Sequence, residues 1–242
     1  MAGAPCLARR GAGIIVYQEP TFDLGYWGAE MLAVSGNRRQ RAARDRMASA
    51  ALEYAAMGWP CFPGAHPPAA GDRSCSCDRI GCPDPAAHPV SAAWAHQASA
   101  DPDRIRRWWS QRPQSNIILP TGRVFDVFDV PSAAGAAALD RIARDDLPVG
   151  PVANLGDERY LFFVATRGAP ADEDEWWSCH LDTSPETVAE TPGMRWHCRD
   201  SYVVAPPSML ASGKEAAWVR PPRDEPLPDP LRLLEVLADS CE

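Results

Sequence analysis

The sequence contains no apolar run long enough to cross a membrane, since a spanning helix needs roughly 18 or more consecutive apolar residues. The apolar stretch at residues 11–17 is too short for a signal-peptide core, and acidic residues follow it in place of a cleavage site. We therefore expect a cytoplasmic protein with no membrane partner. In that compartment its eight cysteines are expected to bind metal or to stay free thiols rather than form disulfides.

Several common functional motifs are missing as well. The sequence has no phosphate-binding P-loop, no dinucleotide-binding GxGxxG and no hydrolase GxSxG. Its net charge of −8 argues against a general polyanion binder, because the mean field of the chain repels phosphates. Any nucleic acid is then expected to bind at a local basic patch.

The 242 residues, 45% of them hydrophobic, suit one large α/β domain or two small lobes that share a cleft. No internal repeat is present. Helical and strand-like segments alternate through the first half and strands dominate later. This order favours an α/β fold with a mixed sheet.

Three regions are expected along the chain, and residues 1–45 form the first, an N-terminal extension rich in Gly, Ala and Arg. It is either a flexible tail, a product of a start upstream of Met31 or Met47, or a basic arm for nucleic acid. The basic arm would depend on five arginines within residues 36–46 and on an ordered partner. The other regions are a domain at 46–220 and a proline-rich linker with a short helix at 221–242.

Within the domain, apolar periodicity predicts helices at residues 42–57 and 132–143. A third helix is expected after Asp101, whose side chain can cap it, with Pro102 at the first helical position. Strands are expected at residues 59–62, 116–119, 124–130, 160–165 and 202–205. The segment 160–165 is apolar throughout, as in a strand buried on both faces.

A cluster of cysteines with one histidine is the sharpest local signal. Three thiols and an imidazole suit a tetrahedral zinc ion, with the ligands Cys75, Cys77, Cys82 and His88. The loop at residues 61–90 has little apolar content, so zinc would supply the order that a core cannot. Cys61 and His66 are alternative candidates for one ligand, and a loop of free thiols is the simpler alternative. No neighbouring general base favours a catalytic zinc.

Four segments together resemble the N-terminal domain of bifunctional primase-polymerases, of the archaeo-eukaryotic primase superfamily, in its actinobacterial form. Residues 50–63 resemble the opening helix and strand of that domain, and residues 75–89 resemble its Cys/His insert. Residues 101–122 resemble its paired-tryptophan helix and the following strand, and residues 202–218 resemble a motif near its end. The shared order of these segments makes the resemblance specific over residues 50–218.

The resemblance implies a two-lobed primase-polymerase fold in which an RRM-like half carries the active site. Active members join nucleotides with divalent metals, Mg²⁺ or Mn²⁺, held by carboxylates, and a histidine touches the incoming triphosphate. Two of the carboxylates form an Asp-x-Asp pair on one strand. Alternate residues of a strand share a face, so both acids point into the cleft and clamp the metals.

This sequence departs from the family pattern at its acids. By the resemblance, Asp129 takes the first acid position and Pro131 the second, where it cannot bind a metal. Asp126 lies three residues before Asp129, which places it on the opposite face of a strand unless a bulge intervenes. Asp129 and Asp126 are therefore vestigial catalytic candidates.

The remaining family positions differ too. Arg195 or Trp196 fills the slot of the third acid, and Asp200 stands where the family has glycine. Tyr160 takes the place of the histidine, and its hydroxyl is neutral near pH 7. The candidate nucleotide-binding residues are Arg159, Tyr160 and Ser208. The Cys/His pairs at 179–180 and 197–198 are interpreted as coincidence.

These departures favour a primase-polymerase-like domain that has lost catalysis and binds a nucleotide, a nucleic-acid end or a protein partner. One alternative is an active primase or polymerase with rearranged acids, namely Asp126, Asp129 and Asp200. Another is a protein-interaction module that binds no nucleotide.

Overall fold

The computed structural model of the chain describes residues 45–68, 75–77, 79–166 and 193–241. They belong to one compact unit, Arg41–Glu242. The expected N-terminal extension up to residue 44 and the Cys/His pair at 179–180 lie outside the described residues. None of the described helices is long and apolar enough to cross a membrane.

Helices and strands follow the expected order, with small shifts in their bounds. The first described element is a helix at residues 45–56. The elements after it are β1 (Phe62–Gly64), α2 (Trp94–Gln97), α3 (Pro102–Gln111), β2 (Asn116–Pro120), β3 (Phe125–Pro131), α4 (Ser132–Arg144), β4 (Val152–Leu155), β5 (Arg159–Ala165), β6 (Arg195–His197), β7 (Tyr202–Ala205), β8 (Ala216–Arg220) and α7 (Pro230–Asp239). Asp101 caps α3 by accepting hydrogen bonds from two backbone N–H groups, as predicted.

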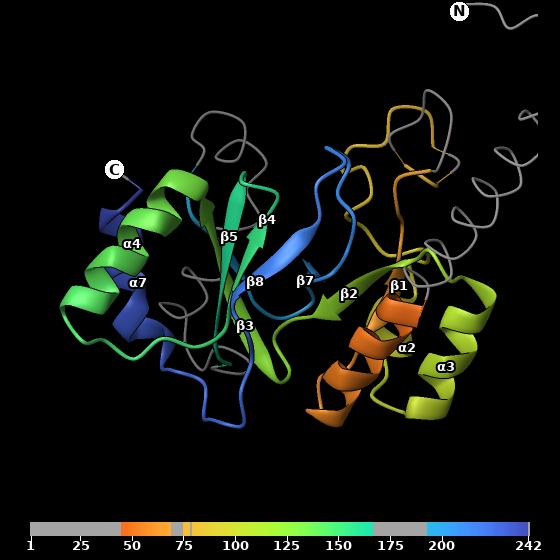
Figure 1. The fold of residues 1–242 in the computed structure, drawn as a ribbon, viewed down its shortest axis with the longest axis horizontal. Coiled ribbons are helices and arrows are strands. Elements are labelled where there is room, and N and C mark those ends of the chain that lie inside the picture. Colours follow the sequence, from red (N-terminus) through yellow and green to blue (C-terminus); the bar gives the residue numbers. More distant parts are fainter. Residues whose placement is uncertain (1–44, 69–74, 78, 167–192, 242) are drawn as a thin grey trace, which may run out of the picture. The chain divides into compact units, whose positions relative to one another are not determined.

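The strands form two sheets, one ordered β1-β2-β7 and the other β6-β3-β5-β4-β8 (Figure 1). All strand pairings among the described residues are antiparallel, so the expectation of a mixed sheet is wrong. Helix α4 does cross over from β3 to β4, and these two strands run in the same direction. However, β5 lies between them and pairs antiparallel with both, so no parallel ladder forms.

The central strands β3 and β5 are buried on both faces, as the apolar run at 160–165 predicts. On one face Phe125 and Phe163 pack into a core shared with the helix at 45–56 and with α3. On the other face Phe128 and Phe162 pack into a second core under α4 and α7 (Figure 1). Successive residues alternate between the cores because strand side chains point to opposite sides.

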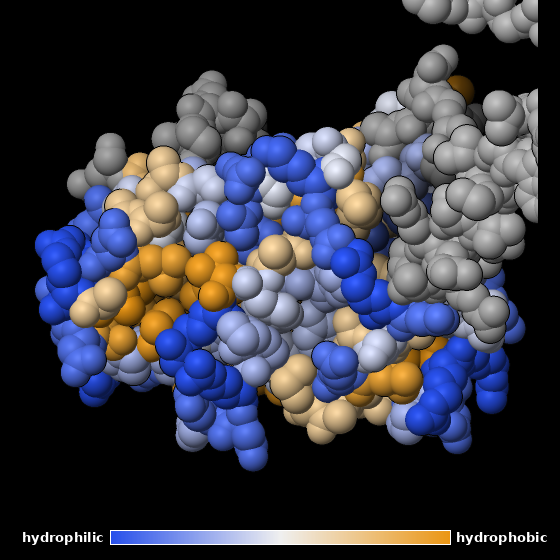
Figure 2. Space-filling view, viewed as in Figure 1, coloured by the Kyte–Doolittle hydropathy of each residue, from blue (hydrophilic) through white to orange (hydrophobic). Residues whose placement is uncertain are grey.

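Helix α7 belongs to the second core, although the sequence analysis separates residues 221–242 from the domain. Its Leu233 and Leu237 are fully buried there, and Asp239 forms a 2.8 Å ion pair with Arg141 of α4. In the view of Figure 2, most of the surface is hydrophilic, and a patch of apolar surface gathers at the side where α4 and α7 lie.

Two glycines with the same backbone conformation test the packing of the turns. Gly122, between β2 and β3, has φ +76°, and a Cβ added to it would lie 2.2 Å from the Cα of Arg199, in the turn after β6. Gly58 has φ +75°, but an added Cβ meets nothing within 4 Å. The two positions therefore share the conformational strain of a substitution and differ only in the backbone contact.

We expect Gly58→Ala to lower the free energy of unfolding by about 1 kcal/mol, the cost of a left-handed residue with a side chain. Gly122→Ala should cost at least about 3 kcal/mol, because backbone must also move apart. Urea denaturation of both variants measures the difference. Equal losses of stability would contradict the close contact between the two turns.

Candidate functional site

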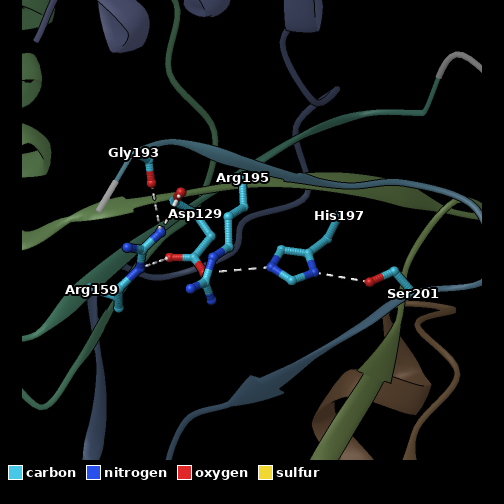
Figure 3. A network of polar contacts seen from close by, with 6 residues as sticks. All are labelled: Asp129, Arg159, Gly193, Arg195, His197 and Ser201. Atoms are coloured by element: carbon cyan, nitrogen blue, oxygen red, sulfur yellow. Dashed lines mark hydrogen bonds and ion pairs between the residues drawn. The ribbon is translucent and has the colours of Figure 1, made fainter. Parts of the chain in front are cut away.

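A polar cluster interrupts the apolar face that β3 presents to the first core. Along this face Phe125 and Val127 are followed by Asp129. Asp129 pairs in register with Leu161 of β5 on one side and with Arg195 of β6 on the other. The Asp129 side chain is only 7% exposed. An ionised carboxylate this buried needs protein cations or hydrogen-bond donors that stabilise its negative charge. Figure 3 shows the basic side chains around Asp129.

Arg159, at the start of β5, makes the closest contacts with Asp129. Its Nε lies 2.5 Å from Asp129 Oδ1, and its Nη2 donates to the backbone carbonyls of Asp129 at 2.9 Å and Gly193 at 3.2 Å. The guanidinium therefore bonds both the side chain and the main chain of Asp129. This geometry uses the planar fork of arginine and fixes the orientation of the carboxylate.

Strand β6 supplies the other basic groups of the cluster. Arg195 Nη1 lies 3.9 Å from Asp129 Oδ2, and His197 Nε2 lies 3.5 Å from the same oxygen. The second ring nitrogen of His197, Nδ1, lies 2.9 Å from Ser201 Oγ (Figure 3). Trp196, between the two basic residues, packs into the second core. Alternation along β6 thus places both basic side chains on the face of Asp129.

These neighbours set the protonation of Asp129. Burial is the largest single effect and would raise its pKa. The hydrogen bond and charge of His197, together with the guanidinium of Arg159, outweigh burial and lower the pKa of Asp129 below its usual value. At neutral pH Asp129 is therefore an ionised carboxylate whose two oxygens both face protein cations.

The other expected acids do not join Asp129. Asp126 is buried on the opposite face of β3, and β3 pairs with β5 in unbroken register from Phe125 to Pro131, so no bulge changes its facing. Asp200 lies in the turn after β6, with a side chain 76% exposed and paired with Arg199. The three acids of the active alternative thus face in different directions.

Two of the three candidate nucleotide-binding residues lie away from this cluster. Tyr160 is on the α4 face of β5, where a Cβ added to Gly135 would lie 2.7 Å from its Cγ. The register thus puts Arg159, and not Tyr160, on the face of Asp129, while the replacement of the family's histidine by Tyr160 stays a prediction. Ser208 is fully buried, and its Oγ accepts a hydrogen bond from the Ile117 N–H at 2.9 Å. Its hydroxyl therefore holds the backbone together.

The polar cluster opens into a pocket of about 610 Å³. The pocket is bounded by β3, β5, β6 and β7, and by the loop that carries the cysteines. Its charged and hydroxyl-bearing lining residues are Asp84, Asp129, Glu158, Arg159, Arg195, His197, Ser201, Tyr202 and Ser212. A pocket of this volume is large enough for a small ligand of nucleotide size.

The structure brings the four predicted metal ligands together. The ligand atoms of Cys75, Cys77, Cys82 and His88 all lie within 4.8 Å of one another, and no other such group occurs among the described residues. His88 Nδ1 lies 2.9 Å from the carbonyl oxygen of Pro89. This carbonyl fixes Nδ1 as the protonated nitrogen and leaves Nε2 for a metal.

Within the Cys/His cluster the pKa values of Cys77 and Cys82 shift in opposite directions, and burial raises that of Cys82 to about 11. A backbone hydrogen bond from Arg79 is the main cause that lowers the pKa of Cys77 to about 7, toward the thiolate that binds metal. Burial raises the pKa of Cys61 to about 12, and Cys61 lies outside the cluster, as does His66. The same loop places Asp84 in the wall of the pocket.

His197 and Ser201 are site residues that the sequence analysis misses. It treats the pair at 197–198 as coincidence, and Ser201 belongs to no recognised motif. The usable signal is the alternation from Arg195 to His197 on one strand face. That signal becomes visible only when β6 is known to pair with β3.

The fold and the site define an α/β protein with a ligand-sized pocket beside a potential metal-binding loop. Residues 51–231 match the family model of the bifunctional DNA primase/polymerase N-terminal domain. The chain therefore belongs to this family, and the resemblance seen in the sequence is confirmed. No curated protein matches the chain.

Asp129→Asn tests the ion pair, because it removes the negative charge and leaves Arg159 in place. An uncompensated buried charge costs roughly 3–5 kcal/mol, and we expect a loss of folding stability near the lower end of that range. Asp157→Asn breaks the exposed ion pair with Lys214 and is the matched control, which should leave stability almost unchanged. Guanidinium denaturation at pH 7 measures both variants.

The contribution of the Asp129–Arg159 ion pair to folding stability should depend on pH, and the lowered pKa of Asp129 gives the direction. Because the folded-state pKa of Asp129 is lowered, its stabilising contribution is present above the usual carboxyl pKa of about 4 and is lost as the pH falls through the folded-state pKa. Wild type should therefore lose stability more steeply on acidification than Asp129→Asn. Parallel profiles would contradict the ion pair.

Proposed function

We propose that the chain is a primase-polymerase-family domain that binds a nucleotide or a nucleic-acid end without joining nucleotides. The ion pair of Asp129 with Arg159 carries this proposal, because Asp129 stands where the family resemblance places a metal-binding acid. Arg195 lies beside it in register, near the slot where another acid is expected. The site has cations of the protein where the family chemistry needs divalent ions.

Two-metal catalysis needs several carboxylates that clamp ions roughly 4 Å apart. A metal at Asp129 would have to displace Arg159, and Asp126 and Asp200 face elsewhere. Asp84 and Glu158 also line the pocket, yet the described residues contain no group of three carboxylates close enough to share an ion. These observations disfavour an active enzyme with rearranged acids, which would require Mg²⁺ or Mn²⁺.

Arg195 is the group best placed to bind a phosphate. Its side chain is 39% exposed, its contact with Asp129 is a long 3.9 Å, and it lines the pocket. Arg159, by contrast, is committed to Asp129. A partly exposed guanidinium that faces a pocket is suited to a phosphate group.

The two sheets would be the two halves of the family fold. In the larger sheet α4 links β3 to β4, β5 lies between them, and β6 pairs with the outer side of β3. This split βαβ arrangement is typical of ferredoxin-like and RRM-like halves. The arrangement therefore supports the assignment of the larger sheet to the RRM-like half of the family fold.

We further infer that the Cys/His cluster binds zinc as a structural ion. Three thiolates and one imidazole complete a tetrahedral shell without an open position. A cytoplasmic location fits this assignment, because a reducing compartment keeps the thiols of the Cys/His cluster available for a metal.

Primer extension and de novo primer synthesis with Mg²⁺ and Mn²⁺ test the proposed loss of catalysis. We expect no incorporation by the full chain. In the same buffers, nucleoside triphosphates or short DNA should raise the melting temperature, because a ligand of the native state stabilises it. Arg195→Ala should remove most of that shift, and Arg104→Ala, on the surface of α3, should not.

Incorporation that disappears in Asp129→Ala would contradict the proposal and establish an enzyme. Absence of any thermal shift with every nucleotide and DNA tested would also contradict it. That result would favour a module that binds only a protein partner.

Metal analysis tests the zinc assignment. We expect about one zinc per chain, as a single closed site requires. Cys82→Ser should lose the zinc and destabilise the loop, whereas Cys61→Ser should retain it because Cys61 lies outside the cluster. Full zinc content in Cys82→Ser would refute the assignment.

A further inference from the structure

Three residues of the polar cluster form a continuous chain of contacts that nucleotide binding does not explain. Ser201 Oγ lies 2.9 Å from His197 Nδ1, and His197 Nε2 lies 3.5 Å from Asp129 Oδ2 (Figure 3). All three residues line the same pocket. A hydroxyl, a base within hydrogen-bond reach, and an acid that orients the base are the parts of an activated serine nucleophile.

The turn that carries Ser201 is held rigidly. Thr121 Oγ1 donates to the carbonyl of Cys198 at 2.6 Å, and the Thr121 N–H donates to the carbonyl of Ser201 at 2.9 Å. Gly122 lies against Arg199 so closely that no side chain fits there. The loop between β2 and β3 thus fixes both ends of the Cys198–Ser201 turn.

The residue before Ser201 has a strained backbone. Asp200 adopts φ 61°, a left-handed conformation that residues with side chains rarely take. Such strain persists where the surrounding structure imposes it, and Ala86, Asp146 and Asp157 also adopt positive φ among the described residues. In the nucleophile elbow of α/β-hydrolases a strained turn presents the serine to the pocket, and here the strained residue directly precedes the serine.

The charges around His197 assign the roles of its two ring nitrogens. Asp129 is ionised and can only accept, so Nε2 is the ring nitrogen of His197 that donates to Oδ2, and in the neutral imidazole that a base requires Nε2 carries the single ring proton. Nδ1 is then the acceptor that faces the Ser201 hydroxyl. Arg159 engages Oδ1 and leaves Oδ2 for the histidine. Asp129 is a positioning residue in this arrangement, and His197 is the base.

We propose that Ser201 is a catalytic nucleophile that is acylated by carboxylic esters bound in this pocket, with His197 as the general base. Ser201 Oγ bonds to the ester carbonyl carbon while its proton moves to His197 Nδ1. The ester C–O bond then breaks, and the leaving alcohol takes that proton. Water hydrolyses the acyl-serine by the same two proton transfers. Arg195, on the same pocket wall, is the cation available to the developing oxyanion.

An alkyl fluorophosphonate with a mass tag tests the nucleophile on the folded full chain as purified. Attack forms the Ser201 O–P bond and expels fluoride, and the hydroxyl proton passes through His197 to solvent. We expect one tag per chain, mapped by peptide mass spectrometry to Ser201. Ser201→Ala should abolish the labelling, and His197→Gln should slow it at least about 100-fold, the usual contribution of a general base.

Controls separate this activity from incidental reactivity and from loss of structure. Ser110→Ala, on the exposed face of α3, should label like wild type, and heat-unfolded protein should not label. Circular dichroism and thermal melting must show that Ser201→Ala, His197→Gln and the less stable Asp129→Asn are folded at the assay temperature; if His197→Gln is not, His197→Asn replaces it. In Asp129→Asn, the turnover number for p-nitrophenyl acetate should fall while KM stays unchanged.

Absence of labelling in the folded wild type would overturn the proposal. So would a tag on Ser212, which lines the same pocket and has no histidine partner among the described residues, or a labelling rate that His197→Gln leaves unchanged. None of these outcomes depends on nucleotide binding. Failure of the serine nucleophile and failure of the proposed nucleotide binding can therefore be distinguished.

Discussion

The constraint that organises this site is the burial of the Asp129 carboxylate on the face of β3 that is otherwise packed into the first core. An ionised group in such surroundings must be neutralised by partners at short range. Asp129 obtains them from Arg159 of β5 on one side and from Arg195 and His197 of β6 on the other. Because β3 lies between β6 and β5, basic side chains of both neighbouring strands can contact the Asp129 carboxylate.

The same constraint supports the proposed loss of the metal-dependent chemistry of the family. A carboxylate already engaged through both oxygens offers little to a divalent ion, and the neighbouring arginines would repel one. Its ion pairs nevertheless orient polar groups toward a pocket. The chain passes from the larger sheet to the smaller one at the turn after β6, so His197 and Ser201 lie where the two sheets meet that pocket.

Local chemistry could be predicted from the sequence with some success. The cap at Asp101, the opposed faces of Asp126 and Asp129, and the proximity of the four Cys/His ligands all follow from local rules of capping, alternation and spacing. Membership of the primase/polymerase family was also visible, because several short segments occur in a shared order.

Features that depend on which strands pair could not be predicted in this way. The insertion of β5 between β3 and β4 makes the sheet antiparallel, where alternating elements favour a mixed one. The same register places Arg159 at the cluster and turns Tyr160 toward α4. His197 was missed because its importance comes from β6 pairing with β3, across a long stretch of chain.

The most direct test of this account is a crystal structure of the protein grown with Mn²⁺ and a nucleoside triphosphate, with anomalous data collected for manganese. The account predicts no anomalous peak within coordination distance of Asp129, and an intact contact between Asp129 and Arg159. A peak about 2 Å from the Asp129 carboxylate, the distance expected for a directly bound small divalent ion, with Arg159 displaced, would contradict it. That result would indicate that Asp129 binds a catalytic metal ion, as the family resemblance implies for active members.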